Sequence, residues 1–147
     1  IAASAVFGGM VSHASPEIVA ALERFGEDIG EVFQLADDLI DITSTATGKT
    51  PGTDLREKVP TLPTLMLRSS GDPSDDELKK MLDADLSDDA VLADVLEKLR
   101  ANHVVEEARA EIQRRADRAR THLAPLPEGD AKQALMALCD EVVSRSS

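Results

Sequence analysis

Apolar residues recur at helical spacing along almost the whole chain, and no segment alternates with the two-residue period of a strand. The longest helical pattern begins at Ser15-Pro16-Glu17, a helix-start signal, and continues to Asp41. Glycine, proline and short polar segments interrupt the pattern between the predicted helices. The sequence therefore predicts an all-α chain with helices at about residues 1–13, 16–41, 61–69, 75–83, 88–101, 103–123 and 128–145.

Two features of these helices predict how they pack. Gly26 and Gly30 lie one turn apart in the longest helix, where each glycine costs about 1 kcal/mol relative to alanine. Close approach of a neighbouring helix or of a ligand would justify them, and helix packing is the favoured explanation. The helix at 103–123 carries charges of both signs at i,i+3 and i,i+4 spacing, which predicts a solvated outer face.

An unusual acidic cluster lies near the end of the longest predicted helix. Asp37 and Asp41 fall one turn apart, Asp38 lies three residues before Asp41, and Gln34 lies three residues before Asp37. Carboxylates this close repel one another and are costly to desolvate, so a cation should meet them. Hard oxygen ligands on a helix suit Mg²⁺. Spacing alone leaves two interpretations open, a metal site and an acidic face exposed to water.

The other two aspartate pairs show what ordinary helix starts look like. Asp75-Asp76 lies within a Ser74-x-x-Glu77 sequence, which predicts a capping box. Asp88-Asp89 follows a serine and opens another apolar run, where negative charge favours the helix N-terminus. Asp37-Asp38 differs from both pairs because it lies inside a helical pattern and has no helix start to cap.

A basic loop follows the acidic cluster. Five glycine and proline residues between 48 and 63 interrupt any long helix, and the loop begins seven residues after Asp41. Lys49, Arg56 and Lys58 lie in this loop of an otherwise acidic protein. Each is a surface charge when considered alone. Together with the aspartates, they could clamp a phosphate bridged to the same metal.

These two segments resemble the trans-polyprenyl diphosphate synthases. The resemblance rests on Phe33-Gln34-Leu35-Ala36-Asp37-Asp38-Leu39-Ile40-Asp41, then Gly48-Lys49-x-x-Gly52-x-Asp54-Leu55, then Pro60-Thr61-Leu62-Pro63. They match the family's second aspartate-rich motif and the loop after it. An isolated Asp-Asp-x-x-Asp would be weak evidence, whereas the elements together are specific. The resemblance covers residues 1 to about 70 clearly and the later helices by composition only.

The resemblance implies a fold, a reaction and a set of site residues. The family's helices surround a central cavity in which Mg²⁺ binds an allylic diphosphate, which ionises and is attacked by isopentenyl diphosphate, releasing pyrophosphate. By this match Asp37 is the expected direct metal ligand, and Asp38 and Asp41 ligate metal or orient its waters. Lys49 is expected to contact diphosphate, and Gln34 to stabilise positive charge near the reacting carbons. Lys58 is a further candidate for diphosphate binding.

The chain also departs from the family pattern. The family usually has glycine, then a variable residue, where this chain has Lys58-Val59, which weakens the case for Lys58. The first aspartate-rich motif is missing, and the chain starts without methionine. We therefore expect residues 1–147 to be the C-terminal part of a single all-α prenyltransferase domain whose N-terminal half is missing, inactive alone. The resemblance also implies a homodimer.

Composition excludes several other classes of protein. A net charge of −12, with 2% aromatic residues and no Trp or Tyr, argues against nucleic-acid binding. The single cysteine, Cys139, excludes an internal disulfide and suits a reducing compartment. No signal peptide or transmembrane run is evident, so we expect a cytoplasmic protein with at most transient membrane contact. The three histidines lack the spacing of a zinc site.

Two alternatives to the synthase remain. A non-catalytic partner subunit could bind a full-length synthase and modulate it, but such a subunit would need neither the aspartate motif nor the Gly48-Lys49 element. A terpene cyclase of the same fold would also ionise a diphosphate. Gly52-Thr53-Asp54-Leu55 and Pro60-Thr61-Leu62-Pro63 count against the cyclase, because they resemble the chain-elongating branch.

Overall fold

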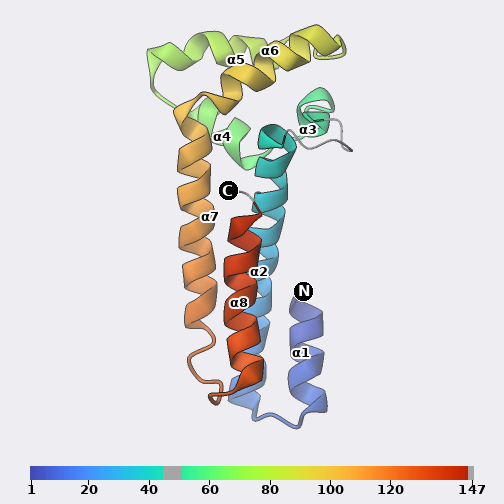
Figure 1. The fold of residues 1–147 in the computed structure, drawn as a ribbon, viewed down its shortest axis with the longest axis vertical. Coiled ribbons are helices and arrows are strands. Elements are labelled where there is room, and N and C mark those ends of the chain that lie inside the picture. Colours follow the sequence, from blue (N-terminus) through green and yellow to red (C-terminus); the bar gives the residue numbers. More distant parts are fainter. Residues whose placement is uncertain (45–50, 146–147) are drawn as a thin grey trace. The chain divides into compact units, whose positions relative to one another are not determined.

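The computed structural model describes residues 1–44 and 51–145, and these residues form helices and no strand. The predicted all-α class is therefore confirmed. The helices are α1 (Ala2–Val11), α2 (Pro16–Thr43), α3 (Thr53–Arg56), α4 (Leu62–Ser69), α5 (Asp76–Asp83), α6 (Asp89–Arg100), α7 (His103–Thr121) and α8 (Asp130–Ser144), with a 3₁₀ turn, η1 (Pro73–Asp75), before α5 (Figure 1). Predicted and observed ends differ by a few residues at most, and α3, a single turn inside the basic loop, was not predicted.

The chain forms two compact units. The first comprises Ile1–Ala36 and Glu111–Arg145, and the second comprises Asp37–Ala110. Helices α2 and α7 each contribute residues to both units. None of the helices formed by the described residues combines the length and apolar character needed to span a bilayer.

In the first unit, α1 lies beside α2 at very short range (Figure 1). A Cβ atom added to Gly26 would come within 2.5 Å of the Ala2 Cα atom, and one added to Gly30 within 3.8 Å of the Ile1 Cβ atom. Backbone-to-backbone contact of this kind leaves no room for a side chain at Gly26. The prediction that helix packing explains these glycines is confirmed for Gly26, whereas a Cβ atom at Gly30 would make only an ordinary van der Waals contact.

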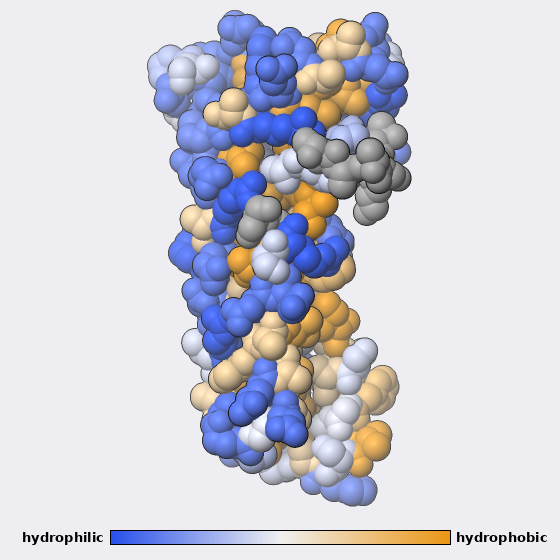
Figure 2. All heavy atoms as spheres, in the orientation of Figure 1, coloured by the Kyte–Doolittle hydropathy of each residue, from blue (hydrophilic) through white to orange (hydrophobic). Residues whose placement is uncertain are grey.

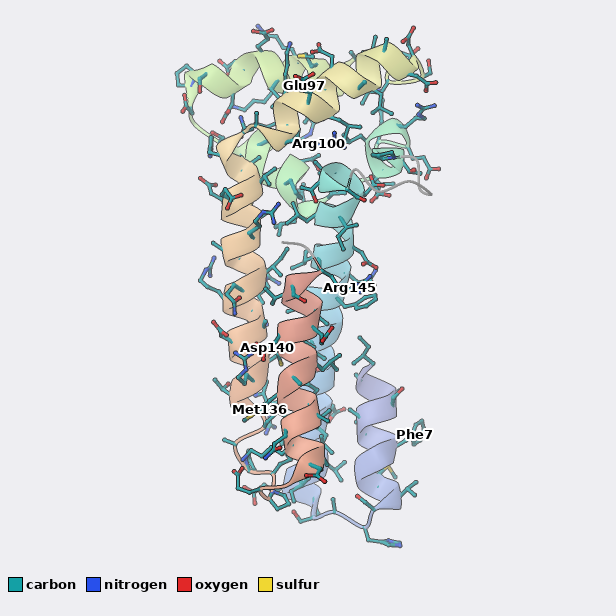
Figure 3. All side chains as sticks on the ribbon, viewed as in Figure 1. Phe7, Glu97, Arg100, Met136, Asp140 and Arg145 are labelled. Atoms are coloured by element: carbon teal, nitrogen blue, oxygen red, sulfur yellow. The ribbon has the colours of Figure 1, made fainter. Side chains whose placement is uncertain are left out.

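Charged residues of α7 bridge neighbouring helices of the first unit. Arg118 donates two hydrogen bonds to the Asp28 carboxylate of α2, at 2.9 and 2.7 Å. Arg115 pairs with Glu31 of α2, and Arg120 donates to Asp140 of α8 at 2.5 Å (Figure 3). The Arg118 side chain is still 55% exposed, so the predicted solvated face is confirmed there, whereas the side chains of Arg115 and Arg120 are 28% and 30% exposed. Helical spacing shows which charges share a face, but it does not show which neighbouring helix that face meets.

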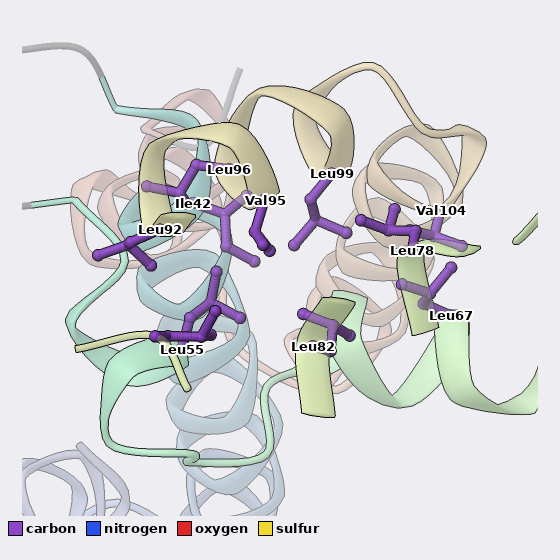
Figure 4. Packing of buried hydrophobic residues seen from close by; sticks show 11 residues of the cluster. Ile42, Leu55, Leu67, Leu78, Leu82, Leu92, Val95, Leu96, Leu99 and Val104 are labelled. Atoms are coloured by element: carbon purple, nitrogen blue, oxygen red, sulfur yellow. The ribbon is translucent and has the colours of Figure 1, made fainter. Parts of the chain in front are cut away.

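Leucine and valine side chains from several helices form the core of the second unit (Figure 4). Ile42, at the end of α2, is fully buried in this core. Its buried partners are Leu55, Leu67, Leu78, Leu82, Leu86, Leu92, Val95, Leu96, Leu99 and Val104. Hydrophilic residues cover most of the molecular face shown in Figure 2. The core fixes the end of α2, and hence the predicted acidic site, against α3 and α6.

Asp75 has a different role from the predicted capping box. Asp72, not Ser74, accepts the first amide of the turn, from Ser74 at 2.8 Å, and α5 begins without a side-chain cap. Asp75 is only 1% exposed and accepts hydrogen bonds from Asn102 Nδ2 at 2.7 Å and His103 Nε2 at 3.1 Å. The capping-box prediction was wrong because the helical segment already begins after Asp72, and the buried Asp75 carboxylate instead joins η1 to the start of α7.

We expect Gly26→Ala to destabilise the chain. The new methyl group would meet the backbone of Ala2, which cannot rotate away, so α1 must shift. The repulsion should exceed the gain in helix propensity and lower the free energy of unfolding by about 1–2 kcal/mol in urea titrations.

Gly8→Ala is the matched control, because it lies in α1 with nothing within 4 Å of its added Cβ atom. This change should raise the free energy of unfolding by about 0.5–1 kcal/mol. Equal effects of the two substitutions would contradict the packing argument.

Acid should weaken the fold through Asp75. Hydrogen bonds from Ser70, Asn102 and His103 hold the pKa of this carboxyl at about 2, below its ordinary value of 3.8. A lowered pKa contributes stability above the ordinary value, and that contribution is lost as the pH falls from about 4 toward 2. Asp75→Asn should lower the free energy of unfolding at pH 7 and flatten its decline between pH 5 and 2.

The exposed neighbour Asp76 provides the control. Asp76→Asn should keep the wild-type decline of stability with acid. An unchanged acid profile in Asp75→Asn would show that Asp75 is not the titrating anchor.

Candidate functional site

The site is built on the C-terminal end of α2, whose last carbonyl groups are held by other segments. Arg100 of α6 donates from Nε to the Ile42 carbonyl oxygen at 2.6 Å and from Nη2 to the Ser44 carbonyl oxygen at 3.3 Å (Figure 3). The Gly52 amide donates to the Asp41 carbonyl oxygen at 3.0 Å. The final carbonyls of a helix have no partners within it, and a cation is favourable there. These bonds therefore fix the direction in which α2 ends.

Asp41 caps the N-terminus of α3. Its Oδ2 atom accepts a hydrogen bond from the Asp54 amide at 3.2 Å. Gly52 precedes α3 in the left-handed region, with φ of 78°, and a Cβ atom there would come within 3.0 Å of Leu96 and 3.1 Å of Leu92. Glycine is thus required both for the backbone angle and for packing against α6. The Gly-x-Asp-Leu sequence brings a second acidic residue, Asp54, beside Asp41.

Asp38 meets the N-terminus of α4. Its Oδ2 atom lies 3.4 Å from the Leu62 amide, which donates to it. The start of α4 is stabilised by a capping box between Thr61 and Thr64. The Thr64 hydroxyl accepts a hydrogen bond from the Thr61 amide at 2.9 Å, and the Thr61 side chain pairs with the Thr64 backbone. Both threonines are buried. The Pro-Thr-Leu-Pro sequence therefore positions a helix start, with its partial positive charge, opposite Asp38.

Two aspartates of the cluster, Asp38 and Asp54, have a raised pKa. Burial raises the pKa of Asp38 above its ordinary value, and the charges of Asp54, Asp37 and Asp41 raise it further, against the Leu62 amide, which lowers it. Burial and the charge of Asp41 raise the pKa of Asp54. Asp37 is half-buried. Four carboxylates thus share one electrostatic environment in which a cation would relieve the repulsion.

The donor set fits a hard divalent cation bound through few protein ligands. No group of three acidic, histidine or cysteine side chains among the described residues converges closely enough to hold a metal ion. Mg²⁺ ordinarily takes one or two carboxylates and fills its other positions with water and substrate phosphates. Each aspartate bond to an amide uses Oδ2, and a carboxylate has a second oxygen with lone pairs of its own.

The structure places the other predicted site residues in different surroundings. Gln34 is exposed on α2, within the first unit. Lys49 lies outside the described residues, so its predicted diphosphate contact stays a prediction. Lys58 is exposed and has a left-handed φ of 56°, and its charge helps to lower the pKa of Asp85. Neither its predicted role nor that of Gln34 is tested by this geometry.

Asp54 is the site residue that sequence reasoning missed. It was part of a quoted motif but was not assigned to the acidic cluster, because it lies 13 residues after Asp41 on a separate element. The signal that could have found it is Gly52. A conformationally special glycine before a short helix predicts a sharp return of the chain toward α2.

The comparisons with known proteins agree on one family. The family model described as Polyprenyl synthetase matches residues 1–99. The nonaprenyl diphosphate synthase of Mycobacterium tuberculosis is 44% identical over 148 residues, which cover 99% of this chain and 44% of that protein. The octaprenyl diphosphate synthase of Escherichia coli is 32% identical, covering 97% of this chain and 45% of that protein.

Solved structures show the same similarity. A geranylgeranyl pyrophosphate synthase from Corynebacterium glutamicum, crystallised with calcium and isoprenyl diphosphate, has a TM-score of 0.90 and 39% identity, covering 99% of this chain and 46% of that one. A decaprenyl diphosphate synthase from Rhodobacter capsulatus has a TM-score of 0.82 and 29% identity, covering 99% of this chain and 46% of its own. The chain therefore spans about half the length of the relatives it matches.

Replacing Arg100 should loosen the end of α2. Arg100→Met keeps the aliphatic stem but removes the bonds to the Ile42 carbonyl in the last turn of α2 and to the Ser44 carbonyl just after it. We expect the free energy of unfolding to fall by about 1.5–3 kcal/mol, the usual range for hydrogen bonds of charged groups. Amide hydrogen exchange should also quicken in the last turn of α2.

Lys98→Met, on the same helix, is the control, because its ion pairs with Asp94 and Glu77 lie on the surface. It should change the free energy of unfolding by less than about 1 kcal/mol. Comparable losses in the two variants, or unaltered exchange in Arg100→Met, would show that Arg100 does not hold α2.

Proposed function

Because the chain belongs to the polyprenyl synthetase family, we propose that it carries the second aspartate-rich site of a chain-elongating prenyltransferase. The reaction condenses an allylic diphosphate with isopentenyl diphosphate and releases pyrophosphate. The observation that carries the proposal is the group of carboxylates held at the starts of α3 and α4. Burial and the charges of neighbouring aspartates raise the pKa of Asp38 and of Asp54.

The proposed metal is Mg²⁺, with Asp37 as the direct ligand. Asp38 and Asp41 would ligate a metal or orient its waters, each fixed by the amide that it accepts. A bound divalent cation would neutralise the charge that builds on the departing pyrophosphate. In support, the similar synthase from Corynebacterium glutamicum was solved with calcium and isoprenyl diphosphate. Carboxylate oxygens are the ligands that such divalent cations prefer.

Two polar residues complete the proposed chemistry. Lys49 follows α2 in the sequence and would contribute a positive charge to the diphosphate. Gln34 precedes Asp37 by three residues along α2, and its amide oxygen would stabilise positive charge on the reacting carbons. Diphosphate binding by Lys58 stays a prediction from the sequence.

The length of the relatives shapes the rest of the proposal. Since the chain spans 44–46% of them, we propose that it acts as the C-terminal part of a single prenyltransferase domain, together with an N-terminal half that carries the first aspartate-rich motif. The central cavity, the inactivity of the isolated chain and a homodimeric assembly belong to the same proposal. A cytoplasmic location is proposed from the lone, buried Cys139.

The two alternatives gain no comparable support. The relatives reported above are named as diphosphate synthases of defined chain length, not as cyclases. A modulating partner subunit would not require carboxylates paired with the amides of two different helix starts. The chain-elongating synthase remains the function that the geometry supports best.

The proposal predicts that Asp37 is essential. In a protein that contains this chain together with the N-terminal half, Asp37→Ala should lower kcat/KM for condensation by about 100-fold or more, because a ligand of the catalytic metal is lost. Raising the Mg²⁺ concentration should restore part of the activity. Condensation would be measured with a radiolabelled substrate, and residues 1–147 alone should show no turnover in that assay.

Asp83→Asn supplies the control, since Asp83 is an exposed aspartate paired with Arg68. It should keep activity within about 3-fold of the wild type. Nearly full activity in Asp37→Ala would rule out the proposed metal site, and turnover by residues 1–147 alone would rule out the need for a second half.

A further inference from the structure

The end of α3 contains a lysine where the backbone geometry favours glycine. The Val59 amide donates to the Asp54 carbonyl oxygen at 2.8 Å, and the Lys58 amide donates to the Leu55 carbonyl oxygen at 3.2 Å. This pair of bonds is the Schellman pattern, whose left-handed position is usually glycine. Lys58 occupies that position with φ of 56°, a strained angle for a side-chain-bearing residue. Its departure from the family's usual glycine therefore has a structural cost.

A half-open pocket of about 160 Å³ lies beside this lysine, within the second unit. Leu55 and Leu82, both buried, form apolar parts of its wall. Val59 and Leu65 also line it, and they are 43% and 52% exposed. Its volume is close to the roughly 150 Å³ of an apolar protein cavity that admits a benzene ring. The space thus suits an apolar body of about six carbon atoms.

Two cations, Lys58 and Arg68, and one carboxylate, Asp83, line the same pocket. Arg68 uses Nη2 to bond Asp83 at 2.7 Å, and a guanidinium has five N–H donors in all. No hydrogen bond or ion pair of the Lys58 ammonium is found among the described residues. The pKa of nearby Asp85 is lowered mainly by hydrogen bonds from Ser87, with a smaller effect of the Lys58 charge. Both cations therefore retain capacity to bind an anion.

We propose that this pocket binds a short-chain organic phosphate, with a five- or six-carbon apolar body between Leu55 and Leu82 and its phosphate beside Lys58 and Arg68. A lysine ammonium and a planar guanidinium together suit a phosphate, which offers several charged oxygens. The sequence predicted that Lys58 binds the diphosphate of the substrate. In the present proposal Lys58 instead binds the phosphate of a ligand in this pocket. It does not depend on the aspartate site or on Mg²⁺.

The test is a titration of residues 1–147 with isopentyl phosphate in the presence of EDTA, followed by methyl NMR of Leu55, Leu65 and Leu82. EDTA removes divalent cations, so binding at the aspartates does not contribute. Saturable shifts of these methyl groups are expected. Affinity should fall about 10-fold or more in Lys58→Gly and in Arg68→Gln, the loss expected for a charged hydrogen bond. Lys58→Arg should retain affinity within about 3-fold.

Lys58→Gly separates ligand binding from folding. Glycine relieves the left-handed strain, so the melting temperature should stay unchanged or rise while affinity is lost. Lys80→Gln, which removes an exposed lysine of α5 outside the pocket, should leave affinity unchanged.

Several results would overturn the proposal. One is the lack of saturable shifts up to about 10 mM isopentyl phosphate. Another is wild-type affinity in both Lys58→Gly and Arg68→Gln. Equal binding of inorganic phosphate or isopentanol would show that the apolar and charged parts do not act together, and equal binding of 4-methylpentanoate would show that the site does not select phosphate.

Discussion

The structure of the second unit depends on how the C-terminal end of α2 is held. Ile42 is buried in the core, Arg100 bonds the last carbonyls of α2, and the carboxylates of Asp38 and Asp41 accept amides at the starts of α4 and α3. Each of the hydrogen bonds satisfies a backbone group that a helix terminus leaves without a partner. Removing one contact would therefore disturb both the packing of α2 and the placement of its carboxylates.

This arrangement reconciles two interpretations of the acidic cluster that spacing alone left open. Asp38 and Asp41 do have structural partners, which are amides on other helices rather than bulk water. Those amides hold the carboxylates in place but do not neutralise them, since burial and neighbouring aspartates still raise the pKa of Asp38 and Asp54. Capping bonds that use one oxygen of a carboxylate are compatible with cation binding by the other.

The sequence predicted the helices well because apolar periodicity, proline and glycine act locally. Gly26 could be interpreted correctly because a glycine inside a long helix has few explanations besides close packing. The errors concerned tertiary context. Asp75 resembled a helix cap but is buried against Asn102 and His103, and the pairing of the exposed Arg118 with Asp28 was not predicted. Asp54 joined the site only through a chain reversal at Gly52, which periodicity does not reveal.

The most direct test of the account is paramagnetic relaxation by Mn²⁺, used in place of Mg²⁺ together with inorganic pyrophosphate, on isotopically labelled residues 1–147. We expect amide signals to broaden first at Asp37, Asp38, Asp41, Asp54 and Leu62, and the broadening to vanish when excess EDTA is added. Broadening centred on other acidic segments, such as Asp75-Asp76 or Asp88-Asp89, with these five amides unaffected, would contradict the claim that the end of α2 is a divalent-cation site.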